Sequence, residues 1–475
     1  MKNVFYGVHF YLNINNLNKI VKKDENKHED LARSFHALEI FLKSIEKFVL
    51  DIGNIEIEKF TTSRLHLYTK DCGENSIIKM MQVICFSNSL TDYMHKSIGK
   101  YKNLDQFTIG VGADSGYFTE FVFSDPESQL MEMTTIGSPA NRAAKLQANC
   151  ANAEMLFSKE VYDFLPQNIK SVFWGDGLLS AKLAKKYAEL TVYKANYDSV
   201  EELLPERYFN RKKSVFEFAT QQANGTNVGD IDFSDANSLL DFTNLSLKKS
   251  KHLTEAAVLY ADIRGFTNKV DEESLSDIKQ LTQMVLKGMN KAVRQHDGVH
   301  VQFQGDRESA IFNAYNSEED YFALRALFGA MRMLDMVDII NQDRNEDRLD
   351  IGIGVSLGDT FATRVGVRNN KDNVIMGETV KEADTAEDEV AGVNLENHKT
   401  ELVVTSEFYN YLVNNQQKYS KIIRQIFSLR KVANQIYYVC TIGYKDFQSK
   451  LIERARDNNA NNAKSNTDLR PWSKE

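Results

Sequence analysis

One ordered set of short motifs occurs twice in this chain, and that repeat constrains the fold more than any other feature of the sequence. The motifs follow one another in the same order in each half, and their copies are separated by 249, 242 and 240 residues. A separation that changes so little indicates two copies of one domain. The paired segments are Tyr11–Ile14 with Tyr260–Ile263, Ile109–Gly112 with Ile351–Gly354, and Thr135–Gly137 with Ile375–Gly377.

The chain length of 475 residues accommodates two such copies and a connector. We predict one domain over residues 1–200 and a second over residues 253–447. Between residues 201 and 252 the hydrophobic periodicity fades, which predicts a connector with one short helix. Residues 448–475 are rich in Asn, Lys and Arg, so we expect a disordered tail.

Within each copy, apolar runs typical of buried strands alternate with longer amphipathic runs typical of helices. This alternation predicts an α/β sandwich, in which helices cover one face of a sheet. The predicted strands are Val4–Ile14, Asn54–Phe60, Phe107–Ala113, Ala257–Ile263, Val299–Gln304 and Leu349–Val355. The predicted helices are Leu31–Val49, Ile278–Val293 and Tyr321–Ile340.

Composition and charge exclude several classes of protein. Hydrophobic residues make up 42% of the chain and charged residues 26%, which is typical of a globular protein. The net charge of −8 argues against binding nucleic acid through the surface as a whole. The four cysteines lack metal-type spacing, and we find neither a long apolar run nor a secretory leader. We therefore expect a cytoplasmic protein with no nucleic-acid or membrane partner.

Two acidic residues lie at or just after the ends of predicted strands in the second copy. Asp262 ends a hydrophobic segment and precedes Gly265, and Asp306 comes directly after Gly305. If the strands are neighbours, the two carboxylates lie side by side, and divalent cations between them would relieve their repulsion. For either acid alone, a helix cap or a turn remains an alternative role.

These segments together resemble the class III nucleotidyl cyclases. The segment Asp262–Thr267 (Asp-Ile-Arg-Gly-Phe-Thr) matches the family's first metal motif, Gly305-Asp306 the second, and Ile351–Gly354 the strand that follows. The resemblance covers both copies. It implies an α+β, ferredoxin-like sandwich in each, and a head-to-tail internal pseudo-heterodimer.

The resemblance also implies the metal chemistry. Asp262, Asp306 and the carbonyl of Ile263 would hold two divalent cations, Mn²⁺ or Mg²⁺. Those cations would activate the ribose 3′-hydroxyl of a nucleoside triphosphate and neutralise the triphosphate, so that attack on the α-phosphate expels pyrophosphate.

In this family the partner domain supplies further catalytic groups, and the matching segment here is Gly137–Leu146 of the first copy. Asn141 matches the residue that positions the ribose. Lys145 stands where the family has an Arg that stabilises charge on the α-phosphate, and a Lys keeps the charge without the bidentate fork. Arg142 is an alternative for that role, and a capped helix with a solvated basic face is the alternative for the whole segment.

A further Arg lies in the metal-bearing copy. Arg368 follows the Gly strand where the family can place an Arg on the triphosphate. An ordinary surface Arg is the alternative at this position.

Neither copy carries the full set of family residues. In the first copy, Asn13 and a residue at or near Ser63 stand where the second copy has the acids Asp262 and Asp306. In the second copy, the segment Gly377–Thr385 lacks both the Asn and the Arg of the family motif. We therefore expect one composite active site, with metals from the second copy. The mirror-image site would be inactive but could remain a pocket.

Recognition of the base depends on two positions. Glu58 and Lys59 are alternatives for the first, and the spacing to Ser63 favours Lys59; Ser138 is assigned to the second. Phe266, in the first metal motif, is also expected to contact the nucleotide. Adenylate cyclases of this class use Lys and Asp here and guanylate cyclases use Glu and a small residue, whereas Lys with a hydroxyl suits a pyrimidine carbonyl.

The tandem arrangement is similar to that of the stand-alone pyrimidine cyclases of bacterial antiphage signalling. We predict cyclisation of UTP to a second messenger that a separate effector protein reads, with a functional monomer allowed by the internal domain pairing. The alternatives are an adenylate cyclase, a guanylate cyclase, and a catalytically dead nucleotide-sensing scaffold.

Overall fold

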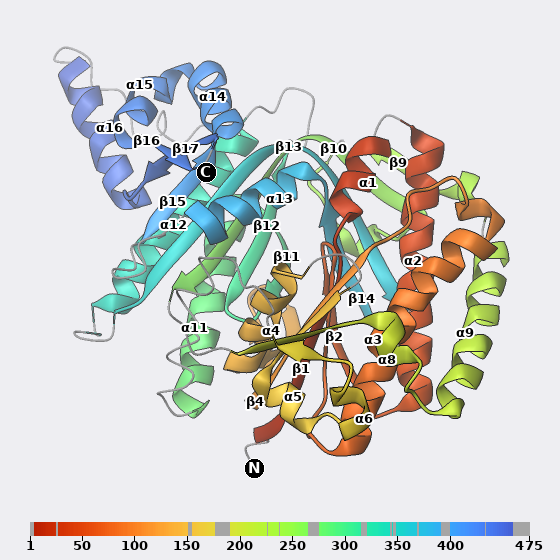
Figure 1. Cartoon of the computed structure of the whole chain (residues 1–475). Coiled ribbons are helices and arrows are strands. Elements are labelled where there is room, and N and C mark those ends of the chain that lie inside the picture. Colours follow the sequence, from red (N-terminus) through yellow and green to blue (C-terminus); the bar gives the residue numbers. More distant parts are fainter. Residues whose placement is uncertain are drawn as a thin grey trace.

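The computed structural model describes residues 4–24, 27–150, 154–175, 191–225, 227–236, 238–264, 275–314, 321–342, 344, 348–367, 370–390, 400–432 and 434–458. Two sheets with their own helices form its two halves, which pack against each other (Figure 1). The first half contains the residues before α9 (Glu206–Gly225). The second half begins with β10 (Lys249–Arg264).

The two sheets have the same strand order. The first runs β2 (Glu56–Thr61), β3 (Arg64–Tyr68), β1 (Val4–Ile14), β4 (Ile109–Asp125), β6 (Glu154–Ser158), β8 (Val192–Asn196) and β7 (Trp174–Gly175), and β5 (Leu130–Ile136) pairs with β4. The second runs β11 (Val299–Gln304), β12 (Arg307–Asn313), β10, β13 (Asp350–Val367), β15 (Glu401–Thr405), β17 (Gln435–Cys440) and β16 (Ser428–Val432), with β14 (Asn370–Met376) on β13. The prediction of two α/β copies is confirmed.

Helices bury their apolar faces on each sheet. The first half has α1 (Leu17–Asp24), α2 (His28–Ile52), α3 (Glu74–Ser97), α4 (Ser138–Ala148), α5 (Lys159–Phe164), α6 (Gln167–Lys170) and α8 (Tyr197–Glu201). The second has α11 (Leu275–Arg294), α12 (Phe322–Asn341), α13 (Glu378–Thr385), a π-helical turn (Ala386–Val390), α14 (Ser406–Asn415), α15 (Gln417–Ile426) and α16 (Tyr444–Asn458). Helices α2 and α3 share one hydrophobic core with β1, and α11 and α12 share another with β10.

Glycines in the repeated Gly-x-Gly strands explain why that motif occurs twice. A Cβ atom on Gly112 would lie 2.1 Å from the backbone nitrogen of Gln147, and one on Gly354 would lie 2.4 Å from that of Glu387. Only glycine lets the helical segment after β5 or β14 approach the sheet so closely. The motif therefore places equivalent segments at equivalent positions in both halves.

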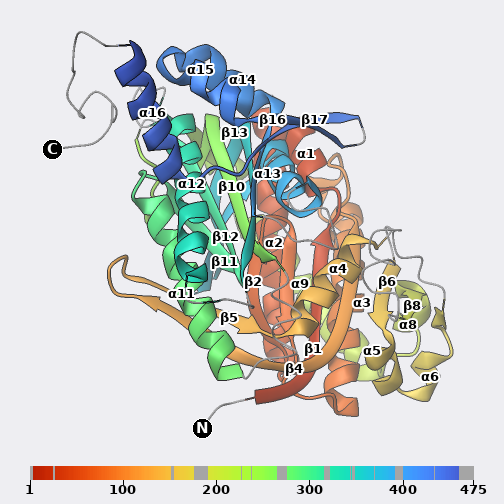
Figure 2. The ribbon, with the colours of Figure 1, turned by 90° about the vertical axis from the view of Figure 1, so that its left-hand side faces the viewer.

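A hairpin of the first half reaches over the second. In Figure 2 the arm formed by β4 and β5 extends beside α11. Lys279 and Gln283 of α11 donate hydrogen bonds to the carbonyls of Glu120 and Ser124 in β4. Arg294 lies 3.1 Å from the buried carboxylate of Asp125. These contacts fix one half against the other.

In two irregular regions the structure has more helix than the sequence analysis expects. The segment predicted as a connector with one short helix contains α9, which has 20 residues and packs on α2 and α3. Its buried residues are Tyr208, Val215, Ala219 and Ala223, a stripe too narrow to stand out in a strongly basic segment. The segment also includes β9 (Asp232–Asp235), parallel to β10. Of the predicted tail, the residues up to Asn458 are helical in α16, and residues 459–475 lie outside the described part.

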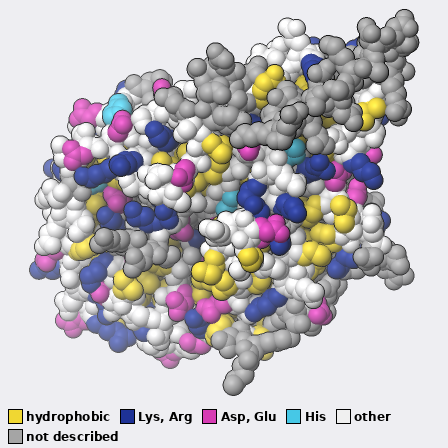
Figure 3. Space-filling model, turned by 180° about the vertical axis from the view of Figure 1, so that it is seen from behind, with side chains coloured by type: hydrophobic (Ala, Val, Ile, Leu, Met, Phe, Trp, Pro, Cys, Tyr) yellow, Lys and Arg dark blue, Asp and Glu magenta, His cyan; other side chains and the backbone are white. Residues whose placement is uncertain are grey.

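The described surface is mixed in charge. On the face shown in Figure 3, Lys and Arg side chains are interspersed with Asp and Glu. Among the residues that the structure describes, no helix is both long enough and apolar enough to cross a membrane.

Candidate active site

The two acids of the predicted metal site lie on neighbouring strands. Asp262 is near the end of β10, and Asp306 is in the turn between β11 and β12. Because β12 pairs with β10, that turn lies beside the end of β10. Burial, followed by the charge of Asp262, raises the pKa of Asp306 well above its usual value. The structure therefore places Asp306 beside the strand end that carries Asp262.

This donor set fits divalent cations. Asp306 is 5% exposed, while the Asp262 side chain is 30% exposed and accessible from one side. Ile263 follows Asp262 in β10, so its carbonyl is the adjacent oxygen donor. Hard cations prefer such oxygen ligands, and a cation would remove the repulsion that raises the pKa of Asp306. Within the described ranges, no three His, Cys, Asp or Glu side chains gather where they could hold an ion. Substrate oxygens would supply further ligands.

Ion pairs that sequence reasoning missed lie next to these acids. Glu387, in the π-helical turn, is 2.6 Å from Nη1 of Arg264 and 2.7 Å from Nη2 of Arg307. Burial raises the pKa of Glu387 to about 7, against the opposite effect of the two arginines. Arg264 closely follows Asp262 in the sequence, and Arg307 closely follows Asp306. This proximity indicates that both arginines lie near the predicted metal site. Glu387 becomes a neighbour only through the fold.

The transition-state candidates lie on α4 of the first half. Asn141 is in the first turn of this helix, and Lys145 is one turn further on. Lys145 forms an ion pair with Asp388 of the second half. Although burial lowers the pKa of Lys145, the carboxylates of Asp388, Glu387 and Asp262 together raise it. Lys145 is therefore in the electrostatic field of a predicted metal ligand from the other half.

Arg142, the alternative to Lys145, is engaged elsewhere. Its Nε donates to the carboxylate of Asp114 at 2.5 Å, and Asp114 is fully buried in β4. This ion pair holds Arg142 against the sheet of its own half.

Of the two candidates for base recognition, Lys59 faces the other half. Its Nζ donates to the carbonyl of Phe303 at 2.6 Å and lies 3.5 Å from Glu132. Phe303 is three residues before Asp306. Lys59 is 5% exposed and therefore sits inside the interface, close to the loop that carries a metal acid.

Glu58 is instead bound within the first half. Its carboxylate accepts hydrogen bonds from Thr134 at 2.7 Å and from Thr135 at 2.6 Å, and it lies 2.9 Å from Nδ1 of His66. Although burial favours the neutral acid, His66 and Lys59 hold the pKa of Glu58 far below its usual range. Glu58 is thus a charged group that orients two threonine hydroxyls.

Thr134 of β5, which is not among the predicted site residues, contacts the turn that carries Asp306. The hydroxyl of Thr134 accepts a hydrogen bond from the backbone nitrogen of Gly305 at 3.3 Å. Ser138, which was assigned to base recognition, is the first residue of α4 and is 5% exposed. The signal that could have found Thr134 is the Thr-Thr pair at the end of β5.

Two predicted site residues cannot be placed. Phe266 and Arg368 lie outside the described residues.

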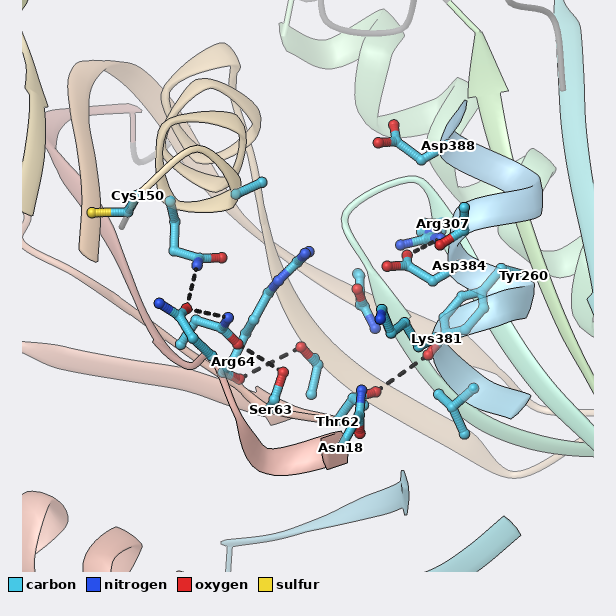
Figure 4. Close-up of a pocket in the computed structure, with 18 residues that line it drawn as sticks. Asn18, Thr62, Ser63, Arg64, Cys150, Tyr260, Arg307, Lys381, Asp384 and Asp388 are labelled. Atoms are coloured by element: carbon cyan, nitrogen blue, oxygen red, sulfur yellow. Dashed lines mark hydrogen bonds and ion pairs between the residues drawn. The ribbon is translucent and has the colours of Figure 1, made fainter. Parts of the chain in front are cut away.

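A cavity of about 510 Å³ lies at the mirror-image position (Figure 4). From the first half it is lined by Asn13 and Ser63, which are hydrogen-bonded at 2.7 Å where the second half has its two acids. From the second half it is lined by Lys381 and Asp384 of α13. The cavity at the mirror-image position is therefore lined by polar side chains from both halves.

Comparison with known proteins agrees with this architecture. Residues 248–441 match the adenylate and guanylate cyclase catalytic domain. A uridylate cyclase of Pseudomonas aeruginosa is 23% identical over 414 residues, which cover 82% of this chain and 75% of that protein. A uridylate cyclase of Burkholderia cepacia is 28% identical over 135 residues, 28% of this chain and 58% of that protein.

Among solved structures, a class III adenylyl cyclase-like ATP-binding protein from Pseudomonas aeruginosa has the same two-domain fold. The TM-score is 0.69 at 19% sequence identity, and the alignment covers 94% of this chain and 90% of the other. Both halves of the chain are included in this likeness.

Proposed function

Because this chain belongs to the class III nucleotidyl cyclases, we propose that it converts UTP to 3′,5′-cyclic UMP and pyrophosphate at one composite site. The observation that carries the proposal is the division of groups between the halves. Asp262 and Asp306 come from the second half, Asn141 and Lys145 come from the first, and the charge of Asp262 acts on Lys145. Neither half contains the set alone.

The residues have separate roles in this proposal. Asp262, Asp306 and the carbonyl of Ile263 hold two cations, Mn²⁺ or Mg²⁺, which supply the charge that activates the 3′-hydroxyl and neutralises the triphosphate. Asn141 orients the ribose. Lys145 stabilises the negative charge that develops on the α-phosphate. Arg368 binds the triphosphate.

Lys59 supports a pyrimidine as the base. Its ammonium group lies beside the turn that carries Asp306 and can donate to a uracil carbonyl, whereas the Thr134 hydroxyl already donates to Glu58. In this proposal Ser138 and Phe266 also contact the nucleotide, and the match to proteins named uridylate cyclase supports the choice of UTP. The product acts as a second messenger in the cytoplasm, where a separate effector reads it during antiphage defence.

The substrate is tested by offering equal amounts of ATP, GTP, CTP and UTP with Mn²⁺ and identifying the products by mass spectrometry. We expect cyclic UMP to dominate. Cyclic AMP or cyclic GMP as the main product would retain the composite site but overturn the assignment of the base. Absence of any product, with or without infected-cell extract, would favour the catalytically dead scaffold.

A further inference from the structure

Glu387 links the two arginines nearest to the predicted metal acids. One carboxylate oxygen lies 2.6 Å from Arg264 and the other lies 2.7 Å from Arg307, and Glu387 is 2% exposed. Arg264 also donates to the backbone carbonyl of Glu387. One side chain therefore connects β10, the start of β12 and the π-helical turn.

Arg264 is a cationic side chain that would compete with a metal ion for Asp262. Its Nη1 lies 3.9 Å from the nearer carboxylate oxygen of Asp262, just beyond a hydrogen bond. A Cβ atom on Gly352 would lie 1.8 Å from its Nη2, so the guanidinium occupies space that glycine leaves open above β13. The guanidinium of Arg264 is therefore closer to Glu387, at 2.6 Å, than to Asp262.

The first half provides an internal comparison. Its β1 and β4 pair Asn13 with Gly110 as β10 and β13 pair Asp262 with Gly352, which makes Asn15 the counterpart of Arg264. The approach of Gln147 to Gly112 makes Gln147 the counterpart of Glu387. Gln147 Nε2 and Asn15 Oδ1 are 3.5 Å apart. The half without metal acids thus has neutral residues at both positions, and the half with metal acids has a charged pair.

We propose that Glu387 is a positioning residue of the metal centre, which binds Arg264 and Arg307 and so keeps the carboxylates of Asp262 and Asp306 available to cations. Partners outside the ligand shell commonly orient metal ligands in this way. The inference rests on the proposed function for the identity of Asp262 and Asp306 as metal ligands. It adds a requirement for a residue that does not touch the metal.

The test measures Mn²⁺ binding by the full chain without nucleotide, from the electron paramagnetic resonance signal of free Mn²⁺. Glu387→Gln, which copies the first half, is expected to weaken Mn²⁺ binding about 10- to 100-fold, because the released Arg264 pairs with Asp262. Arg264→Asn combined with Glu387→Gln should recover most of this loss, since the competing cation is gone. The double variant reproduces the Asn15 and Gln147 arrangement, which the same fold already accommodates.

The matched control is Glu382→Gln in α13, which removes the same charge from a residue bonded to Ser356. Its Mn²⁺ affinity should equal that of the wild type. Unchanged binding in Glu387→Gln, or a double variant as weak as the single one, would overturn the inference. Asp262→Asn distinguishes failure of the proposed function from failure of this inference. If both Asp262→Asn and Glu387→Gln bind Mn²⁺ normally, the metal assignment of the proposed function fails. If Asp262→Asn binds Mn²⁺ weakly while Glu387→Gln binds it normally, only the role of Glu387 fails.

Discussion

Replacing Asp262 with Asn is expected to reduce cyclic-nucleotide formation by about a thousand-fold or more. The amide keeps the shape of the side chain but removes half of the carboxylate pair that would bind the cations. Because the side chain is partly exposed at the end of β10, the fold should be retained. Product formation at saturating Mn²⁺, followed by mass spectrometry, measures the effect.

Thermal unfolding of the metal-free protein gives an independent measurement. The charge of Asp262 contributes to the raised pKa of Asp306, so its removal relieves an unfavourable interaction. The metal-free Asp262→Asn protein should therefore unfold at a higher temperature than the wild type. Asn13→Ala, at the equivalent position of the first half, is the control and should leave turnover unchanged. Normal turnover in Asp262→Asn would contradict the metal assignment.

His300→Gln is expected to cost about 3–5 kcal/mol in the free energy of unfolding near neutral pH, because it leaves buried carboxylates without their cation. The His300 ring nitrogens lie 2.6 Å from Glu308 and 3.1 Å from Glu132, and Glu308 is fully buried. Glu132 belongs to the first half and accepts a hydrogen bond from the backbone of Phe303. The ion pairs of His300 therefore join the halves beside Lys59.

The loss of stability caused by His300→Gln should become smaller as the pH rises. Burial lowers the pKa of His300, but the charges of Glu308 and Glu132 outweigh burial and raise this pKa from 6.5 to about 10. The contribution of His300 is therefore complete below pH 6.5 and is lost as the pH rises through 10. Urea unfolding at pH 6, 8 and 9.5 should show a difference between wild type and His300→Gln that shrinks toward alkaline pH. A difference independent of pH would show that His300 is not held as a cation.

Local patterns predicted the parts of the fold that burial determines. Strands β1 and β11 begin and end where the apolar runs do, because each run has to be buried in its sheet. The β4 strand extends to Asp125, beyond the predicted Ala113, because its second part pairs with β5 to form the arm. The length of helix α9 exceeds the one short helix expected there, because two of its four buried residues are alanines that give a weak hydrophobic pattern.

The candidate site likewise contains some residues that the sequence predicts and others that only the fold reveals. Asp262 and Asp306 stand in recognisable motifs at strand ends, so the sequence was enough to pair them. Glu387 and Thr134 acquire their roles only when distant segments meet, and no local spacing encodes those contacts. The spacing to Ser63 favours Lys59 over Glu58, and the fold adds that Lys59 faces the second half whereas Glu58 bonds within the first.

The central claim is that two unequal halves build one active site, and the number of binding sites per chain tests it most directly. Calorimetric titration with Mn²⁺ and a UTP analogue that cannot be cleaved at the α-phosphate should give one site. Both Asp262→Asn in the second half and Asn141→Ala in the first should weaken that site. Two equivalent sites per chain, or one site that responds to substitutions in only one half, would contradict the account.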